Sequence, residues 1–81
     1  KMSVTTVWIA VNEYTDEVEV FWFAEPARNL VFEWAKDHLK AMYNYDNEEE
    51  LMEEANECVI AAEESPWQGM FRIEERIVRE E

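Results

Sequence analysis

A chain of 81 residues is long enough for one small domain and too short for two separate hydrophobic cores. Hydrophobic residues make up 48% of it and aromatic residues 14%, which excludes a disordered chain, while a single Gly and two Pro exclude collagenous or linker-like character. The 20 acidic and 7 basic residues give a net charge of −13, which disfavours direct contact with nucleic acid or an anionic membrane. We expect one domain over residues 2–81, with Lys1 an expression remnant ahead of Met2.

The first two elements predict a β-hairpin. Residues 4–11 are rich in β-branched side chains, which favours a strand. Residues 17–24 start by alternating charged and apolar side chains, the period of a strand, and the polar residues 12–16 have the length of a hairpin connection. The two faces of the second strand would carry Val18, Val20, Trp22 and Ala24, and Glu17, Glu19, Phe21 and Phe23, respectively.

A helix is predicted next, with Pro26 in its first turn, where proline is tolerated. Apolar residues then recur at intervals of three and four, which is typical of a helix with one buried face. This stripe contains Ala27, Leu30, Val31, Trp34, Ala35, His38, Leu39 and Met42.

A second helix is predicted to begin at Asn47, a good capping residue followed by Glu48, Glu49 and Glu50 in the first turn. It should end before Pro66, because the residue ahead of a proline disfavours helical geometry. Its apolar stripe contains Leu51, Met52, Ala55, Cys58, Val59 and Ala62.

The last segment, residues 69–79, is compatible with either a strand or a helix. We favour a strand, with Phe71, Ile73 and Ile77 facing inward, because a lone hairpin is marginally stable and a third strand completes a usable sheet. The fold class predicted is therefore α+β, in the order ββααβ, with a three-stranded antiparallel sheet and two helices packed on one face.

This layout resembles the many small proteins of bacteriophages and bacteria that carry a hairpin, a helical middle and a returning strand. The segments that carry the resemblance are Val7 to Val11, Val18 to Phe23, the helix from Ala27, and Phe71 to Val78. A likeness of layout implies a fold and transfers no activity.

Motifs for catalysis, cofactors or metals are missing, so we expect a protein that is not an enzyme and has no cofactor. One His and one Cys cannot supply a zinc site, and the alternating Asp46, Glu48 and Glu50 lack the glycine of a calcium loop. His38 is expected at the edge of the core, with a pH sensor or a base as the alternative. Cys58 forms no internal disulfide, which favours a reducing cytoplasm.

Targeting to a membrane or for secretion is not expected. The sequence holds no apolar run near the roughly 20 residues that span a bilayer, and its start has no apolar segment of signal-peptide type.

The segment between Lys40 and Arg72 contains many carboxylates and no Lys or Arg. On a helix, the pairs Glu50–Glu54 and Glu53–Glu57 repel, and anions at the C-terminal end oppose the helix dipole, for a total cost of about 1–3 kcal/mol. Two interpretations stay open: a solvated surface that aids solubility, or a row of carboxylates that imitates the phosphates of a nucleic acid.

Tyr43, Tyr45 and Trp67 lie near the ends of the acidic helix. They either cap the core locally or anchor basic side chains of a partner, since aromatic ring faces attract Arg and Lys. The other aromatic residues are expected to pack in the core.

In size, acidity and layout the chain resembles small phage-encoded proteins that occupy a nucleic-acid site on a host enzyme or defence complex. The resemblance implies an inhibitor in the bacterial cytoplasm that binds a basic protein surface and no nucleic acid or membrane directly. The alternative is a non-inhibitory interaction module or homodimer that buries an aromatic sheet face with Trp8, Phe21 and Phe23. The expected partner-binding residues are Tyr45, Asp46, Glu49, Glu50, Glu53, Glu54, Glu57, Glu63, Glu64 and Trp67.

Overall fold

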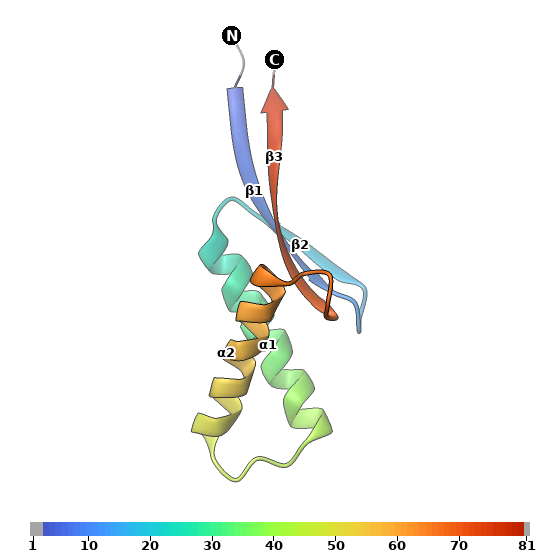
Figure 1. The fold of residues 1–81 in the computed structure, drawn as a ribbon, viewed down its shortest axis with the longest axis vertical. Helices are drawn as coiled ribbons and strands as arrows, with labels where there is room; N and C mark the ends of the chain where they lie inside the picture. The colour runs from blue at the N-terminus through green and yellow to red at the C-terminus, as the bar shows by residue number, and fades with distance from the viewer. Residues whose placement is uncertain (1–2, 81) are drawn as a thin grey trace.

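A computed structural model describes residues 3–80, which form three strands and two helices in the order ββααβ (Figure 1). The elements are β1 (Ser3–Asn12), β2 (Glu17–Phe21), α1 (Ala24–Met42), α2 (Glu48–Glu64) and β3 (Phe71–Glu80). The predicted α+β fold is confirmed, including a strand at the end of the chain. The expectation about Lys1 lies outside the described residues.

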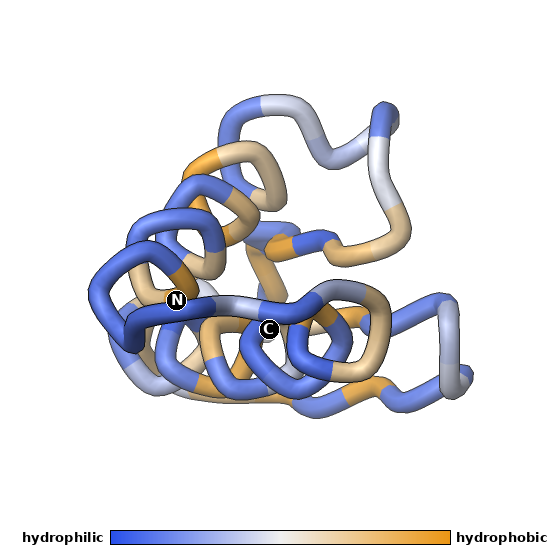
Figure 2. The backbone as a smooth tube through the Cα atoms, turned by 90° about the horizontal axis from the view of Figure 1, so that it is seen from below, coloured by the Kyte–Doolittle hydropathy of each residue, from blue (hydrophilic) through white to orange (hydrophobic). Residues whose placement is uncertain are grey.

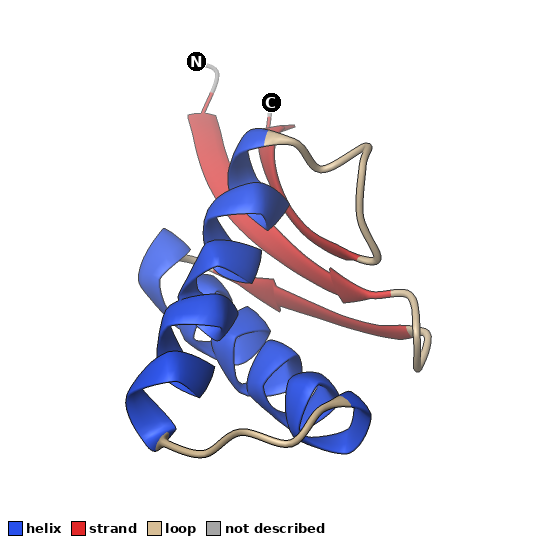
Figure 3. Cartoon of the chain, turned by 60° about the horizontal axis from the view of Figure 1, so that its bottom comes forward, coloured by secondary structure: helices blue, strands red, loops and turns tan. Residues whose placement is uncertain are grey.

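β1 is the central strand of an antiparallel sheet in the order β2-β1-β3. Ala10 lies opposite Glu19 on β2 and Ile73 on β3. Successive residues of a strand point to opposite faces, so Ala10 and Ile73 share the face that the helices cover. Both helices pack against this one face (Figure 3), as predicted.

The hairpin connection is tied down by local hydrogen bonds. The backbone N–H of Tyr14 donates to Oδ1 of the buried Asn12 at 3.0 Å, and Asp16 adopts a left-handed φ of 60°, which suits Asp better than most residues. The N–H of Glu13 donates to the carbonyl of Met70 at 2.8 Å. This last bond joins the hairpin to the loop that leads into β3.

The predicted strand over residues 17–24 is wrong at its end, because β2 stops at Phe21 and Ala24 already belongs to α1. Pro26 therefore falls in the first helical turn, which its fixed φ angle suits, and the helix starts ahead of it. α2 begins as expected, with Oδ1 of Asn47 accepting the N–H of Glu50 at 2.8 Å, and it ends ahead of Pro66.

Small side chains fill the contact between the helices and the sheet. Ala10, Ala27, Ala35 and Ala55 are all 0% exposed, and Val31 is the largest side chain that is fully buried. Alanine at these positions lets the two helices approach β1 and each other closely. Seen from below, hydrophilic and hydrophobic stretches alternate along the helical turns (Figure 2), as expected of helices with one buried face.

Larger apolar side chains surround this centre. Trp8 and Phe21 are half-buried and pack against the core, as expected, so the alternative of an exposed aromatic sheet face has no support at these two residues. Trp22 and Phe23 were also expected to pack in the core, yet both are exposed, because they lie past the end of β2. The uncovered face of the sheet carries aliphatic residues instead, among them Val18 and Val20. Met52, expected in the buried stripe of α2, is exposed.

The molecule is elongated, with principal extents of 56 × 22 × 18 Å and a radius of gyration of 14.4 Å. A compact domain of this length would have a radius of gyration of about 12 Å. The difference arises because β1 and β3 continue together past the helices and past the end of β2 (Figure 1). Ile77 was expected to face inward, yet it is exposed, because it lies on this projecting part.

We predict that Ala55→Leu lowers the free energy of unfolding by about 1–3 kcal/mol, because the added carbons have no space between the helices and the sheet. Ala61→Leu is the matched control, since Ala61 lies exposed on the same helix. Urea denaturation of both variants measures the difference. An Ala55→Leu variant as stable as the control would contradict close packing at this position.

Candidate functional site

α2 carries eight Glu residues and no Lys or Arg. The helix dipole favours those in its first turn and disfavours those in its last. Half-buried Glu54 and Glu63 each have a side-chain partner within residues 3–80, described below. The exposed carboxylates are those of Glu48, Glu49, Glu50, Glu53, Glu57 and Glu64.

Glu63 is the carboxylate of α2 that a cation neutralises within the described part of the chain. Nε of Arg28 on α1 donates to Oε1 at 2.7 Å, and Nη2 donates to Oε2 at 2.8 Å. The hydrogen bond and the negative charge raise the pKa of Arg28. This two-point contact joins the start of α1 to the end of α2, so Glu63 differs from the free carboxylates further up the helix.

Three of the predicted binding residues, Glu49, Glu50 and Glu53, line an open groove of about 810 Å³ that α1 and α2 both border. We call this the acidic groove. Phe32 contributes from α1 and Met52 from α2, and Asn47 and Asn56 complete the lining. Apolar surface beside several carboxylates suits the amphipathic side chains of Arg and Lys, which bury a stem and present a charge.

Phe32 already attracts one cation from the chain itself. Nζ of Lys36 lies 5.6 Å from the centroid of the Phe32 ring and 3.6 Å from Oε2 of Glu33. The geometry shows that this ring face is accessible to an ammonium group from the α1 side.

The predicted residues Tyr45, Asp46 and Glu54 form a separate group at the connection between the helices. The Tyr45 hydroxyl donates to Oε2 of Glu54, and this bond, with partial burial, raises the pKa of Tyr45 to about 12. Tyr43 lies edge-on to Tyr45, with ring centroids 6.4 Å apart. Asp46 is exposed and lines a small recess with Lys40.

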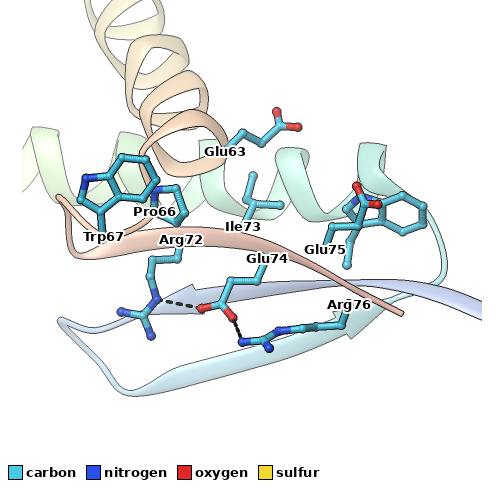
Figure 4. Close-up of a pocket in the computed structure, with 9 residues that line it drawn as sticks. Glu63, Pro66, Trp67, Arg72, Ile73, Glu74, Glu75 and Arg76 are labelled. Atoms are coloured by element: carbon cyan, nitrogen blue, oxygen red, sulfur yellow. Dashed lines mark hydrogen bonds and ion pairs between the residues drawn. The ribbon is translucent and has the colours of Figure 1, made fainter. Parts of the chain in front are cut away.

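Trp67 lies at the other end of α2, in the loop ahead of β3, and is 76% exposed. It lines a pocket of about 550 Å³ beside β3, to which Glu63 also contributes (Figure 4). The structure therefore does not gather the predicted residues into one site. Eight of the ten fall into three groups: the acidic groove, the Tyr45 group, and the Trp67 end with Glu63. Glu57 and Glu64 are exposed on α2 outside these groups.

β3 carries an ion-pair chain that sequence reasoning missed. Arg72 pairs with Glu13 and, through Nε at 3.1 Å, with Glu74, which also accepts from Arg76. These three β3 side chains point away from the helices, whereas Ile73 points toward them (Figure 4). The hydrogen bond from Arg76 is the largest cause that lowers the pKa of Glu74, so the pair contributes stability that is lost as pH falls through this lowered pKa.

His38 lies at the edge of the core, as expected. Its ring stacks on Tyr14 with centroids 4.1 Å apart, and Phe71 meets it edge-on at 6.1 Å. Cys58 is half-buried, and burial raises the pKa of its thiol, which disfavours the reactive thiolate.

Residues 3–80 contain no group of three or more His, Cys, Asp or Glu side chains placed to hold a metal ion. Neither of the described helices is long and apolar enough to cross a membrane.

Phe32 and Met52 are site residues that sequence reasoning assigned to packing. Phe32 does pack partly against the core, as expected, and it lines the groove as well; its place outside the regular apolar stripe of α1 was the available signal for this second role. Met52 gave no such signal, because its spacing fits the buried stripe of α2.

No protein-family model matches the chain, and comparisons with curated proteins and with solved structures found no match.

We predict that the Tyr45 phenol titrates near pH 12, above its ordinary value of 10.0, because the Glu54 carboxylate holds its proton. Between these two pH values the unfolded chain loses a proton that the folded chain keeps. This contribution to stability is therefore complete below pH 10 and is lost as pH rises toward 12.

The measurement is the phenolate absorbance of the wild type minus that of Tyr45→Phe across the pH range. Glu54→Ala should move the midpoint back toward the ordinary value. An unchanged midpoint in Glu54→Ala would show that another group sets the Tyr45 pKa.

Proposed function

We propose that this protein inhibits a nucleic-acid-binding enzyme of a host or a defence complex by occupying its basic nucleic-acid site. The single observation that carries the proposal is the row of exposed carboxylates along α2, which has no Lys or Arg of its own. The phage origin, the bacterial cytoplasm and the absence of catalysis belong to the same proposal.

The spacing of these carboxylates supports phosphate mimicry. From Glu49 to Glu57 the helix axis advances about 12 Å, at 1.5 Å per residue. The four exposed Glu residues in this interval, Glu49, Glu50, Glu53 and Glu57, amount to about one per 4 Å of axis, comparable to the 3.4 Å between phosphates along one DNA strand. A basic cleft built for a phosphate backbone would meet a similar density of negative charge on α2.

Electrostatic steering is the second support. A net charge of −13 attracts a basic surface over a distance of about one Debye length and opposes approach to nucleic acid itself. The carboxylates of the acidic groove would displace anions bound to the Arg and Lys side chains of such a cleft, as phosphates do. Binding should therefore weaken steeply with added salt.

The acidic groove adds short-range contacts to the charge. Phe32 and Met52 offer apolar surface in its lining, together with Glu49 and Glu53. A guanidinium placed there can pair with a carboxylate while its stem covers the apolar side chains. Trp67 and Tyr45 lie near opposite ends of α2, so a target that contacted both would have to follow the length of the helix.

The test compares two variants with the same change in net charge. Glu49, Glu50 and Glu53 are changed to Gln in the groove variant, and Asp16→Asn, Glu17→Gln and Glu19→Gln make up the hairpin control, where all three carboxylates are exposed. The proteins are used as bait in bacterial lysate across a salt gradient. The captured protein is then challenged with nucleic acid.

We expect wild type and the hairpin control to retain a nucleic-acid-binding protein, which moderate salt and added nucleic acid release. The groove variant should bind at least about tenfold more weakly, because each lost charge contact is worth about 0.5–1 kcal/mol or more. Circular dichroism checks that all three proteins are folded. Equal binding by the groove variant and wild type would refute phosphate mimicry by α2.

A further inference from the structure

The sheet has three free edge regions, and two of them are protected against pairing with another chain. β2 is only five residues long and carries Glu17 and Glu19, and six of the ten residues of β3 are charged. Short edge strands and charged edge residues are the usual means by which proteins prevent unwanted strand pairing.

The third edge lacks this protection. β2 pairs with β1 only from Trp8 to Asn12, so residues 3–7 of β1 have no neighbour on that side within the described residues. Their sequence is Ser-Val-Thr-Thr-Val, without charge, proline or glycine, and is rich in β-branched residues that favour strands. We call residues 3–7 the open segment.

Exposed apolar side chains accompany the open segment, although Arg76 and Arg79 of β3 lie opposite Val7 and Val4. It belongs to the projecting two-stranded part of the sheet, where Val4 is 61% and Ile77 64% exposed. Trp22 and Phe23, where the chain leaves β2, are exposed as well. A two-stranded ribbon with apolar side chains facing water is marginally stable alone and gains from further strands.

We propose that the open segment pairs with the same segment of a second copy of this chain, as antiparallel strands across a two-fold axis. The sheet would then continue from β3 through β1 into β1 and β3 of the second copy. This surface lies at the opposite end of the long axis from the start of α2, so the proposal is independent of the proposed function (Figure 1).

Length and charge both favour a second copy as the partner. The open segment ends where Phe21 lies opposite Trp8, so it accepts about five residues of a partner strand, and a second copy presents a segment of the same length. Two chains that each carry −13 repel, and they approach at least cost through their uncharged segments.

The symmetry fixes the register. A two-fold axis perpendicular to the sheet pairs residues on the same face, and the pairing that uses the whole segment places Thr5 opposite Thr5 of the second copy. Val4 then lies opposite Thr6, and Ser3 opposite Val7. Every pair is neutral, and four of the five residues in the segment are Val or Thr, which favour strands.

The test is sedimentation equilibrium over a range of concentrations and salt, with Thr5→Glu and Thr5→Lys measured separately and mixed in equal amounts. Wild type should dimerise, and added salt should leave the dimer intact or tighten it. Each variant alone places like charges opposite each other at the axis and should dimerise at least about tenfold more weakly. The mixture should restore association, because Glu then lies opposite Lys.

Val78→Glu is the matched control. Val78 lies opposite Thr5 on β3, on the same face but one strand away from the open segment, and should change dimerisation by no more than about twofold. Circular dichroism checks the fold of each variant. A monomeric wild type, a failure of the mixture to associate, or a loss of dimer in Val78→Glu equal to that in Thr5→Glu would each overturn the proposal.

Discussion

The unequal length of the strands around β1 is the constraint on which the rest of the structure depends. β1 and β3 pair over ten residues, whereas β2 pairs with β1 over five. The half of β1 that has a neighbour on both sides is also the half that the helices cover, and there Ala10 is buried. The other half has one neighbour and no cover, which makes the molecule elongated and leaves Val4 and Ile77 in water.

Charged side chains are distributed unevenly over the molecule, as are the helices that cover the sheet. Arg28 holds the end of α2, and Arg72 and Arg76 pair along β3, all away from the acidic groove, whereas Lys36 lies over the ring of Phe32 at the α1 side of that groove. Because α2 has no Lys or Arg, its carboxylates repel one another, at a cost of a few tenths of a kcal/mol for each pair four residues apart. Asn47 and the three Glu residues of the first turn offset part of this cost through capping and the helix dipole.

Local sequence patterns predicted the helices and strands well, because the signals for each element lie within that element's own residues. The alternation from Glu17 to Phe21 and the cap at Asn47 need no knowledge of the rest of the fold. The candidate site was harder to predict, because the position of a residue along a helix does not reveal which side chains of other elements lie next to it. Asp46 and Trp67 flank the same helix in sequence, yet they belong to different surfaces about 25 Å of helix apart. Glu63 pairs with Arg28, which lies 35 residues earlier in the chain, so no local pattern could show that this carboxylate is neutralised.

The two proposed binding surfaces make different physical demands, and their separation at opposite ends of the molecule would let them act together. An acidic face would attract a basic partner over a long range, which requires carboxylates that are exposed to solvent and not neutralised by neighbouring Lys or Arg. An uncharged strand edge would contribute only in direct contact, and it needs a partner strand of matching length. Placing them at opposite ends keeps the repulsion between two negative chains away from the strand contact. A pair joined through β1 would also present two acidic helices pointing apart. Such a pair would bind a target with two basic sites more tightly than either copy alone, without any new contact.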